Sequence, residues 1–385
     1  MKIKKKGMNE FPLMDGKKGI PLFLPKISKN GIKAVSETLN TRWIGQGPKV
    51  DKFEKAFKKK FLNNKLEALA VGSGTDALHI AYLLANIKPG DEVLVPVFTC
   101  TATNLPLLYI GAKPIFVDID PMTMNININD VEKKITKKTK ALVCVDYGGV
   151  PNEYLILQKI CKKYNLKLIS DAAHSLGTKY MGKYASMYSD FTTFSFQAIK
   201  TLTTGDGGML VIKDKKLLNK GKRLRWFGID RTQKQAGIWE NDIKDLGYKY
   251  QMNDIAASLG LVGLDEIDSA IKKRVLLFKE YEKNLNHKLI KIVGKSQTKT
   301  YLQSAWIFTI IVEKNQKLLM KKLRKNGIES AQVHYRNDRY SVFGKRVKNL
   351  KYMNYIEDKY LVLPLYPSMK LSDVRNICKI INSGW

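Results

Sequence analysis

The sequence is poor in cysteine and contains no long hydrophobic run. Only four cysteines occur in 385 residues, and they form no CxxC pair and have no histidine cluster nearby. This scarcity argues against a disulfide-stabilised scaffold or a zinc site and is typical of a reducing compartment. No apolar stretch approaches the roughly 18 to 20 residues that a membrane-spanning helix needs. The first apolar run, residues 20–25, is short and contains prolines, so we expect a cytoplasmic protein without a signal peptide or a membrane partner.

Acidic residues are also scarce. Lys and Arg number 67 against 35 for Asp and Glu, so the formal net charge is +32. Such an excess of positive charge could favour binding to nucleic acid, anionic lipid or a phosphorylated small molecule. In residues 51–61, however, Phe53, Phe57 and Phe61 recur at the spacing of one helix face, and lysines occupy the other faces. We therefore interpret the lysines as solvated faces of amphipathic helices and expect no nucleic-acid partner.

A repeated strand–helix pattern extends from about residue 66 to residue 211. Several apolar segments are continuous, as expected for strands covered on both faces, and helical segments such as residues 154–164 connect some of them. The pattern predicts an α/β fold with a mainly parallel sheet between helices. We expect strands at residues 66–71, 92–97, 114–117, 141–145, 167–170, 192–196 and 208–212.

The pattern changes from about residue 267. A long lysine-rich helix, a strand and two further helices indicate a smaller α+β domain, and residues 335–352 read as a long loop. We assign residues 1–265 to an N-terminal segment and the large domain, and residues 266–385 to a small C-terminal domain.

A glycine-rich turn follows the first expected strand. In Gly72-Ser73-Gly74-Thr75 the strand ends and a helix begins, so free backbone N–H groups and the helix dipole form a natural anion cradle. The alternative is a plain helix N-cap with glycines for a tight turn.

Two further motifs place a charged residue at the end of a strand or shortly after it. Asp171 ends the strand expected at residues 167–170 and is followed by His174, and Lys200 comes after the strand at residues 192–196. Asp171 could hold a heterocyclic cation, or it could only cap the next helix. The uncharged neighbours of Lys200 favour a desolvated amine nucleophile, whereas the alternative is a surface lysine. An anion cradle, a strand-end Asp and a strand-end Lys together form the parts of a pyridoxal-phosphate site.

At these motifs the sequence resembles the DegT-type family of sugar aminotransferases, which are pyridoxal-phosphate-dependent enzymes of fold type I. The likeness covers nearly the whole chain. The matching segments are Trp43-Ile44-Gly45-Gln46-Gly47-Pro48, Gly72-Ser73-Gly74-Thr75-Asp76-Ala77-Leu78, Asp171-Ala172-Ala173-His174, Ser195-Phe196 with Lys200, Thr204-Gly205-Asp206-Gly207-Gly208, Gly247-Tyr248-Lys249-Tyr250-Gln251-Met252-Asn253-Asp254, His334-Tyr335 and Leu363-Pro364-Leu365-Tyr366-Pro367.

The resemblance implies a role for individual residues at the cofactor. Lys200 would bond to the cofactor aldehyde, Asp171 would pair with the pyridine nitrogen, and His174 would lie near the phenolic oxygen. The phosphate would be held by Ser73, Gly74, Thr75 and Ser195.

The resemblance also implies a homodimer with shared active sites. A polar residue of the partner's Gly-Tyr-x-Tyr-x segment completes each phosphate site in the family, and Lys249 and Gln251 are the candidates here. Many members stack an aromatic ring on the cofactor where this chain has Cys100, which could be a small apolar contact. Lys200 also separates two chemistries, because a dehydratase branch of the family carries His there.

We therefore expect an aminotransferase that moves an amino group from L-glutamate to a keto sugar nucleotide, with the ketone at position 3 or 4. Its product would be an amino sugar for a surface polysaccharide such as lipopolysaccharide O-antigen. Trp43, Arg231, His334 and Tyr335 are candidate substrate contacts. The alternatives are a sugar-nucleotide dehydratase of the same family and a nucleic-acid-binding regulatory protein on this fold.

Overall fold

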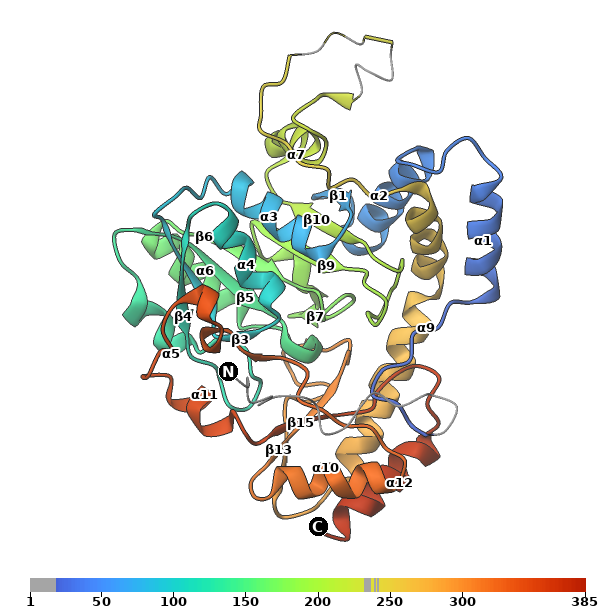
Figure 1. Cartoon of the computed structure of the whole chain (residues 1–385), viewed down its shortest axis with the longest axis vertical. Coiled ribbons are helices and arrows are strands. Elements are labelled where there is room, and N and C mark those ends of the chain that lie inside the picture. The colour runs from blue at the N-terminus through green and yellow to red at the C-terminus, as the bar shows by residue number, and fades with distance from the viewer. Residues whose placement is uncertain (1–18, 232–236, 239, 241) are drawn as a thin grey trace, which may run out of the picture.

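A seven-stranded sheet forms the centre of the larger part of the molecule. The computed structural model describes residues 19–231, 237, 238, 240 and 242–385 (Figure 1). In spatial order the strands are β1 (Glu67–Val71), β10 (Gly208–Ile212), β9 (Phe191–Ser195), β6 (Lys167–Asp171), β5 (Thr139–Val145), β2 (Glu92–Pro96) and β4 (Lys113–Val117).

The sheet is mainly parallel, as predicted. The strands from β9 to β4 all run in the same direction, whereas β10 is antiparallel to both β9 and β1. Every residue of β2 and β10 is buried, which explains why these strands read as continuous apolar runs.

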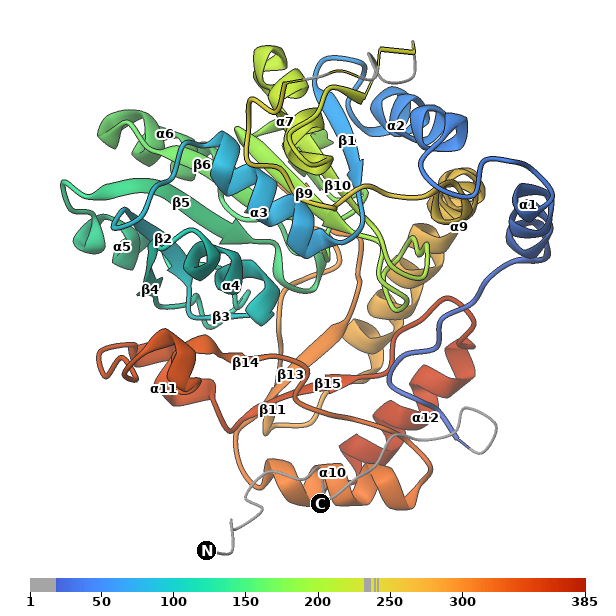
Figure 2. The same cartoon turned by 45° about the horizontal axis from the view of Figure 1, so that its top comes forward.

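Helices cover both faces of this sheet (Figure 2). Residues of α3 pack on one face together with Val95 and Val143, and residues of α6 pack on the other face together with Leu94 and Leu142. Phe53, which lies on α2, is buried against β9 and β10 on that second face. The helices of this part are α1 (Lys29–Leu39), α2 (Pro48–Phe61), α3 (Gly74–Leu84), α4 (Thr101–Tyr109), α5 (Ile128–Val131), α6 (Tyr154–Tyr164) and α7 (Leu218–Arg225).

One long helix, α9 (Asp254–Asn284), connects this sheet to a second, smaller one (Figure 1). The boundary expected at residues 265 and 266 falls inside α9 and stays a prediction. The second sheet has its own apolar core, to which α9 contributes Leu277 and Phe278. It consists of β11 (Ile290–Ile292), β13 (Phe308–Val312) and β15 (Tyr360–Leu363), with α10 (Gln316–Lys325) and α12 (Leu371–Asn382) alongside.

The segment expected as a long loop is anchored at both ends. It begins with β14 (Tyr335–Arg336), which pairs with β3 (Phe98–Thr99) of the large sheet region, and it ends where α11 (Lys351–Ile356) begins. A two-residue strand is too short to produce a detectable alternation, so the sequence pattern could not reveal this pairing. A third small sheet joins β7 (Lys179–Tyr180), β8 (Lys183–Tyr184) and β12 (Tyr301–Leu302).

No helix within the described ranges combines the length and the apolar character that crossing a membrane would require.

Candidate active site

The three motifs meet at one edge of the large sheet. Asp171 ends β6, and Ser195 ends the neighbouring strand β9. Because β10 runs the opposite way, its first residue, Gly208, lies beside both Ser195 and the end of β1. The turn that leads from β1 into α3 therefore reaches the same edge as Asp171.

The cradle forms where β1 ends and α3 begins. Ser73 is the N-cap of α3, and its hydroxyl accepts a hydrogen bond from the amide of Asp76 at 3.1 Å. The amides of Gly74 and Thr75 lie in the first turn, where a helix offers no backbone acceptor and its dipole is positive. A Cβ at position 74 would come within 2.9 Å of the Cβ of Ser195, so glycine allows this close approach. The same turn is thus both an N-cap and a site that can hold a phosphate.

Asp171 is buried and firmly oriented. Its Oδ2 accepts a hydrogen bond from the Thr103 hydroxyl at 2.7 Å, and its Oδ1 accepts one from the amide of Ala173 at 3.1 Å. Burial raises the pKa of Asp171, and these hydrogen bonds together with the charge of Lys200 oppose that rise. A buried carboxylate with this shift lacks a full counter-charge, and a protonated ring nitrogen would supply one.

Lys200 lies half-buried in the turn after β9. Its Nζ lies 3.8 Å from the ring centroid of Trp306. Burial lowers the pKa of Lys200 to about 8, because the opposing influence of Cys100 and Asp171 is smaller. The amine therefore exists in both protonation states near physiological pH, as a nucleophile and proton carrier requires.

His174 stacks on Trp306, with ring centroids 3.8 Å apart and planes inclined by 19°. Burial, together with the charges of Lys200 and His334, lowers the pKa of His174 well below its usual value, so the ring is neutral. The amide of Gly148 donates a hydrogen bond to Nδ1 at 3.4 Å. In a neutral ring with this acceptor the proton is on Nε2, which can donate to a phenolic oxygen.

The structure also brings His334 to this place, through the pairing of β14 with β3. The His334 ring lies parallel to that of His174, with centroids 5.3 Å apart. Its Nε2 is buried and has no hydrogen-bond partner among the described residues, and burial lowers its pKa to about 3. Tyr335 follows as the first residue of β14, and Cys100, which precedes α4, influences the pKa of Lys200.

The segment with Lys249 and Gln251 lies beside the cradle of its own chain. The amide of Gly72 donates to the carbonyl of Tyr250 at 2.7 Å, and Gln251 forms a bridge with the end of β1. The Lys249 Nζ lies 4.6 Å from the ring centroid of Trp226. The Gln251 Oε1 is buried and unpaired among the described residues, so a polar partner for it has to come from elsewhere. A contact of Gln251 with the phosphate site of a second subunit stays a prediction.

Among the described residues, neither Trp43 nor Arg231 forms a hydrogen bond or a ring contact with Lys200. Trp43 is 40% exposed, and Arg231 donates a hydrogen bond to the carbonyl of Gln46. Arg231 lines a hollow of about 340 Å³ whose described walls do not include Lys200. Their contact with substrate therefore stays a prediction that depends on a second subunit.

Sequence reasoning missed Thr103 and Trp306. Thr103 lies on α4 and orients Asp171, and Trp306 comes from the small sheet region, more than a hundred residues after Lys200. The Trp306 Nε1 donates to the carbonyl of Ile199 at 3.0 Å, which fixes the indole against the turn that carries Lys200. Neither residue belongs to a local motif, so only the folded chain reveals them.

These residues fit pyridoxal phosphate. The turn at Gly74 would hold its phosphate, Asp171 its ring nitrogen and Lys200 its aldehyde, and the unpaired Nε2 of His334 is a buried polar atom that awaits a partner. Residues 25–382 match the model of the DegT/DnrJ/EryC1/StrS aminotransferase family. The chain belongs to this family.

Individual relatives agree with this assignment over nearly full length. The GDP-perosamine synthase of Escherichia coli O157:H7 is 33% identical over 368 residues, covering 95% of this chain and 98% of that protein. Two solved structures show the same fold. The putative sugar aminotransferase Spr1654 of Streptococcus pneumoniae, in its PLP form, has a TM-score of 0.88 at 28% identity, covering 95% and 98%. Helicobacter pylori PseC, an aminotransferase of pseudoaminic acid biosynthesis, has a TM-score of 0.88 at 28% identity, covering 95% and 99%.

The expectations on family, fold, enzyme class and cofactor are confirmed. The chain is a pyridoxal-phosphate-dependent aminotransferase with the fold of the solved sugar aminotransferases. The regulatory alternative is therefore not retained.

Proposed function

We propose that this enzyme transfers the amino group of L-glutamate to a keto sugar carried on a nucleoside diphosphate, with the ketone at position 3 or 4 of a 6-deoxy sugar. The product would be an amino sugar for a surface polysaccharide such as O-antigen, made in the cytoplasm by a homodimer. The names of the relatives support an amino-sugar product, since perosamine and pseudoaminic acid are amino sugars.

The observation that carries the proposal is the amine of Lys200 beside the carboxylate of Asp171. Asp171 ends β6, and Lys200 lies in the turn that follows the neighbouring parallel strand β9, which supports placing both groups at one site. A dehydratase of this family would carry His at position 200, so the lysine favours transamination.

The roles of the chain's own residues follow from their geometry. Pyridoxal phosphate, when bound, supplies an electron sink. Asp171, oriented by Thr103, would hold positive charge at the ring nitrogen, and the Nε2–H group of His174 would donate to the ring oxygen. The Nζ of Lys200 would take the proton from the α-carbon of the amino donor in the first half-reaction and give a proton to the acceptor carbon in the second, which a pKa of about 8 allows. The ring of Trp306 contacts this amine on one side.

The two half-reactions test the proposal separately. Purified enzyme mixed with glutamate should change its cofactor absorption and form 2-oxoglutarate, and mass spectrometry after addition of keto sugar nucleotides should identify the aminated product. Lys200→Ala should lower turnover by roughly 10⁴-fold, the upper range for loss of an acid–base group. Lys213, an exposed lysine that directly follows β10 of the same sheet, provides the matched control, and Lys213→Ala should retain activity. No amination of any keto sugar nucleotide by an enzyme that reacts with glutamate would contradict the acceptor class.

A further inference from the structure

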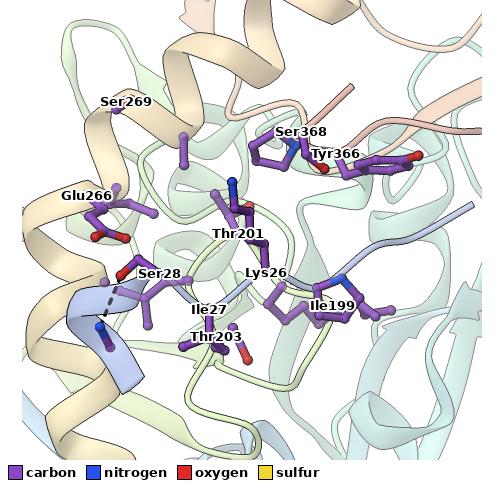
Figure 3. Close-up of a pocket in the computed structure, with 18 of the residues that line it drawn as sticks. Lys26, Ile27, Ser28, Ile199, Thr201, Thr203, Glu266, Ser269, Tyr366 and Ser368 are labelled. Atoms are coloured by element: carbon purple, nitrogen blue, oxygen red, sulfur yellow. Dashed lines mark hydrogen bonds between the residues drawn. The ribbon is translucent and has the colours of Figure 1, made fainter. Parts of the chain in front are cut away.

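A groove of about 680 Å³ opens beside the turn that carries Lys200 (Figure 3). Its walls are residues 23–28, residues 198–203, one side of α9 and residues 366–368. Figure 3 shows Glu266 and Ser269 of α9 on one side and Tyr366 on the other. The volume lies within the range of sites that take a small organic molecule.

Arg274 of α9 is a buried cation in this wall. It is 4% exposed, and its Nη1 donates to the carbonyls of Trp306 and Leu365, each at 2.9 Å. Its Nε is buried and has no acceptor among the described residues. The carbonyls thus occupy one side of the guanidinium and leave the Nε edge without a partner.

Other buried arginines of the chain have carboxylate partners. Arg225, 5% exposed, pairs with Glu54 at 2.6 Å, and Arg336, 1% exposed, pairs with Asp338 at 2.6 Å. Arg274 has no such ion pair within the described ranges, and burial lowers its pKa to about 10. A buried charge without a counter-ion is costly, so an anion that arrives with a ligand would relieve it.

Arg274 is connected to the reacting amine through a single residue. The carbonyl of Trp306 accepts its hydrogen bond, and the ring of Trp306 contacts Lys200. The charged side chains that line the groove have both signs: Lys26, Lys200, Lys273 and Arg274 are basic, and Asp265 and Glu266 are acidic, so the basic ones are in excess. We propose that Arg274 binds an oxyanion of a substrate in this groove, either a carboxylate of the amino donor or a diphosphate oxygen of the acceptor. This assignment rests on the proposed function and names the residue that recognises its charged substrates.

The test is calorimetric binding to the holoenzyme, which needs no turnover. One arm titrates 2-oxoglutarate, and the other titrates UDP, GDP and dTDP. Arg274→Lys keeps the charge and can still donate to the two carbonyls, but it lacks the second N–H edge. Binding in at least one arm should weaken by roughly 10- to 100-fold. The ligand whose affinity falls identifies the source of the oxyanion.

The matched control is Arg336→Lys, a change at an equally buried arginine outside the groove. It should lower the melting temperature and leave both affinities unchanged. Unaltered affinities in Arg274→Lys would overturn the assignment, as would losses that Arg336→Lys reproduces. Intact oxyanion binding without any transamination would count only against the proposed function.

If Arg274→Lys fails to fold, a binding measurement on the unaltered protein tests the proposal instead. Glutamine and isoglutamine each lack one carboxylate of glutamate, and a nucleoside lacks the diphosphate. If Arg274 binds an oxyanion, at least one of these analogues should bind roughly 10- to 100-fold more weakly than the ligand from which it is derived. Equal binding of all three analogues and their parents would overturn it.

Discussion

Two groups of buried or half-buried cations in this chain differ in the groups that they contact. Beneath the segment that follows β14, the side chain of Arg336 is fully buried and forms hydrogen bonds to both oxygens of Asp338, at 2.6 and 2.7 Å. Beside the groove, Lys200 contacts an aromatic ring and Arg274 contacts backbone carbonyls. Arg336 thus contacts a carboxylate directly, whereas neither Lys200 nor Arg274 forms an ion pair within the described ranges.

The pKa directions record the same difference. Burial opposes the charge of Arg336, but Asp338 and Glu357 outweigh it and raise its pKa above the usual value. Burial lowers the pKa of Arg274 to about 10 and that of Lys200 to about 8. Breaking a buried ion pair is costly because it leaves an uncompensated charge, whereas a buried charge without a partner already carries that cost in the fold.

Removing the negative charge of Asp338 should have the largest effect on stability. Asp338→Asn leaves Arg336 buried with only Glu357 as a charged partner, so we expect a loss of about 3 kcal/mol or more in the free energy of unfolding. Urea unfolding measures it. Arg346→Ala removes the exposed partner of the same Glu357 and should cost less than about 1 kcal/mol. A loss at Asp338 no larger than that at Arg346 would remove the distinction between the two groups.

Removing the amine of Lys200 should instead raise the free energy of unfolding. Since the pKa of Lys200 is lower in the folded chain than the usual 10.5, the folded state binds fewer protons between about pH 8 and 10.5, and stability rises with pH in that window. Below pH 8 the cost is fully present. Protein stripped of cofactor should therefore gain up to about 3 kcal/mol from Lys200→Met at pH 7, and the gain should shrink as the pH rises to 10.

Lys213→Met, at an exposed lysine, is the control for this experiment. It should change the free energy of unfolding little at any pH. A gain from Lys200→Met that stays constant from pH 7 to pH 10 would show that the amine does not titrate at a lowered pKa in the fold.

The same division explains what the sequence could predict. The strands β2 and β10, the turn between β1 and α3 and the position of Asp171 at the end of β6 depend on local patterns, and the structure has these elements where expected. Arg274 lies on a lysine-rich helix where nothing in the sequence distinguishes it from its neighbours. Its burial and its lack of a counter-ion arise from contacts with Trp306 and Leu365, which are 32 and 91 residues away in sequence. Local pattern predicts the secondary structure, but the electrostatic state of a side chain depends on the whole fold.

The smallest expected effect concerns the carboxylate that the chain orients but does not neutralise. Thr103→Val keeps the shape of the side chain and removes the hydrogen bond to Asp171, one of the interactions that hold its pKa down. A carboxylate that ionises less readily binds a cationic ring nitrogen less well, so the dissociation constant of the cofactor should rise about tenfold, or about 1.4 kcal/mol. Dialysis followed by absorbance titration measures this constant. Thr103→Ser retains the hydroxyl and should restore tight binding, because the hydroxyl, and not the methyl group, orients Asp171. Equal weakening in both variants would instead assign the effect to packing around α4.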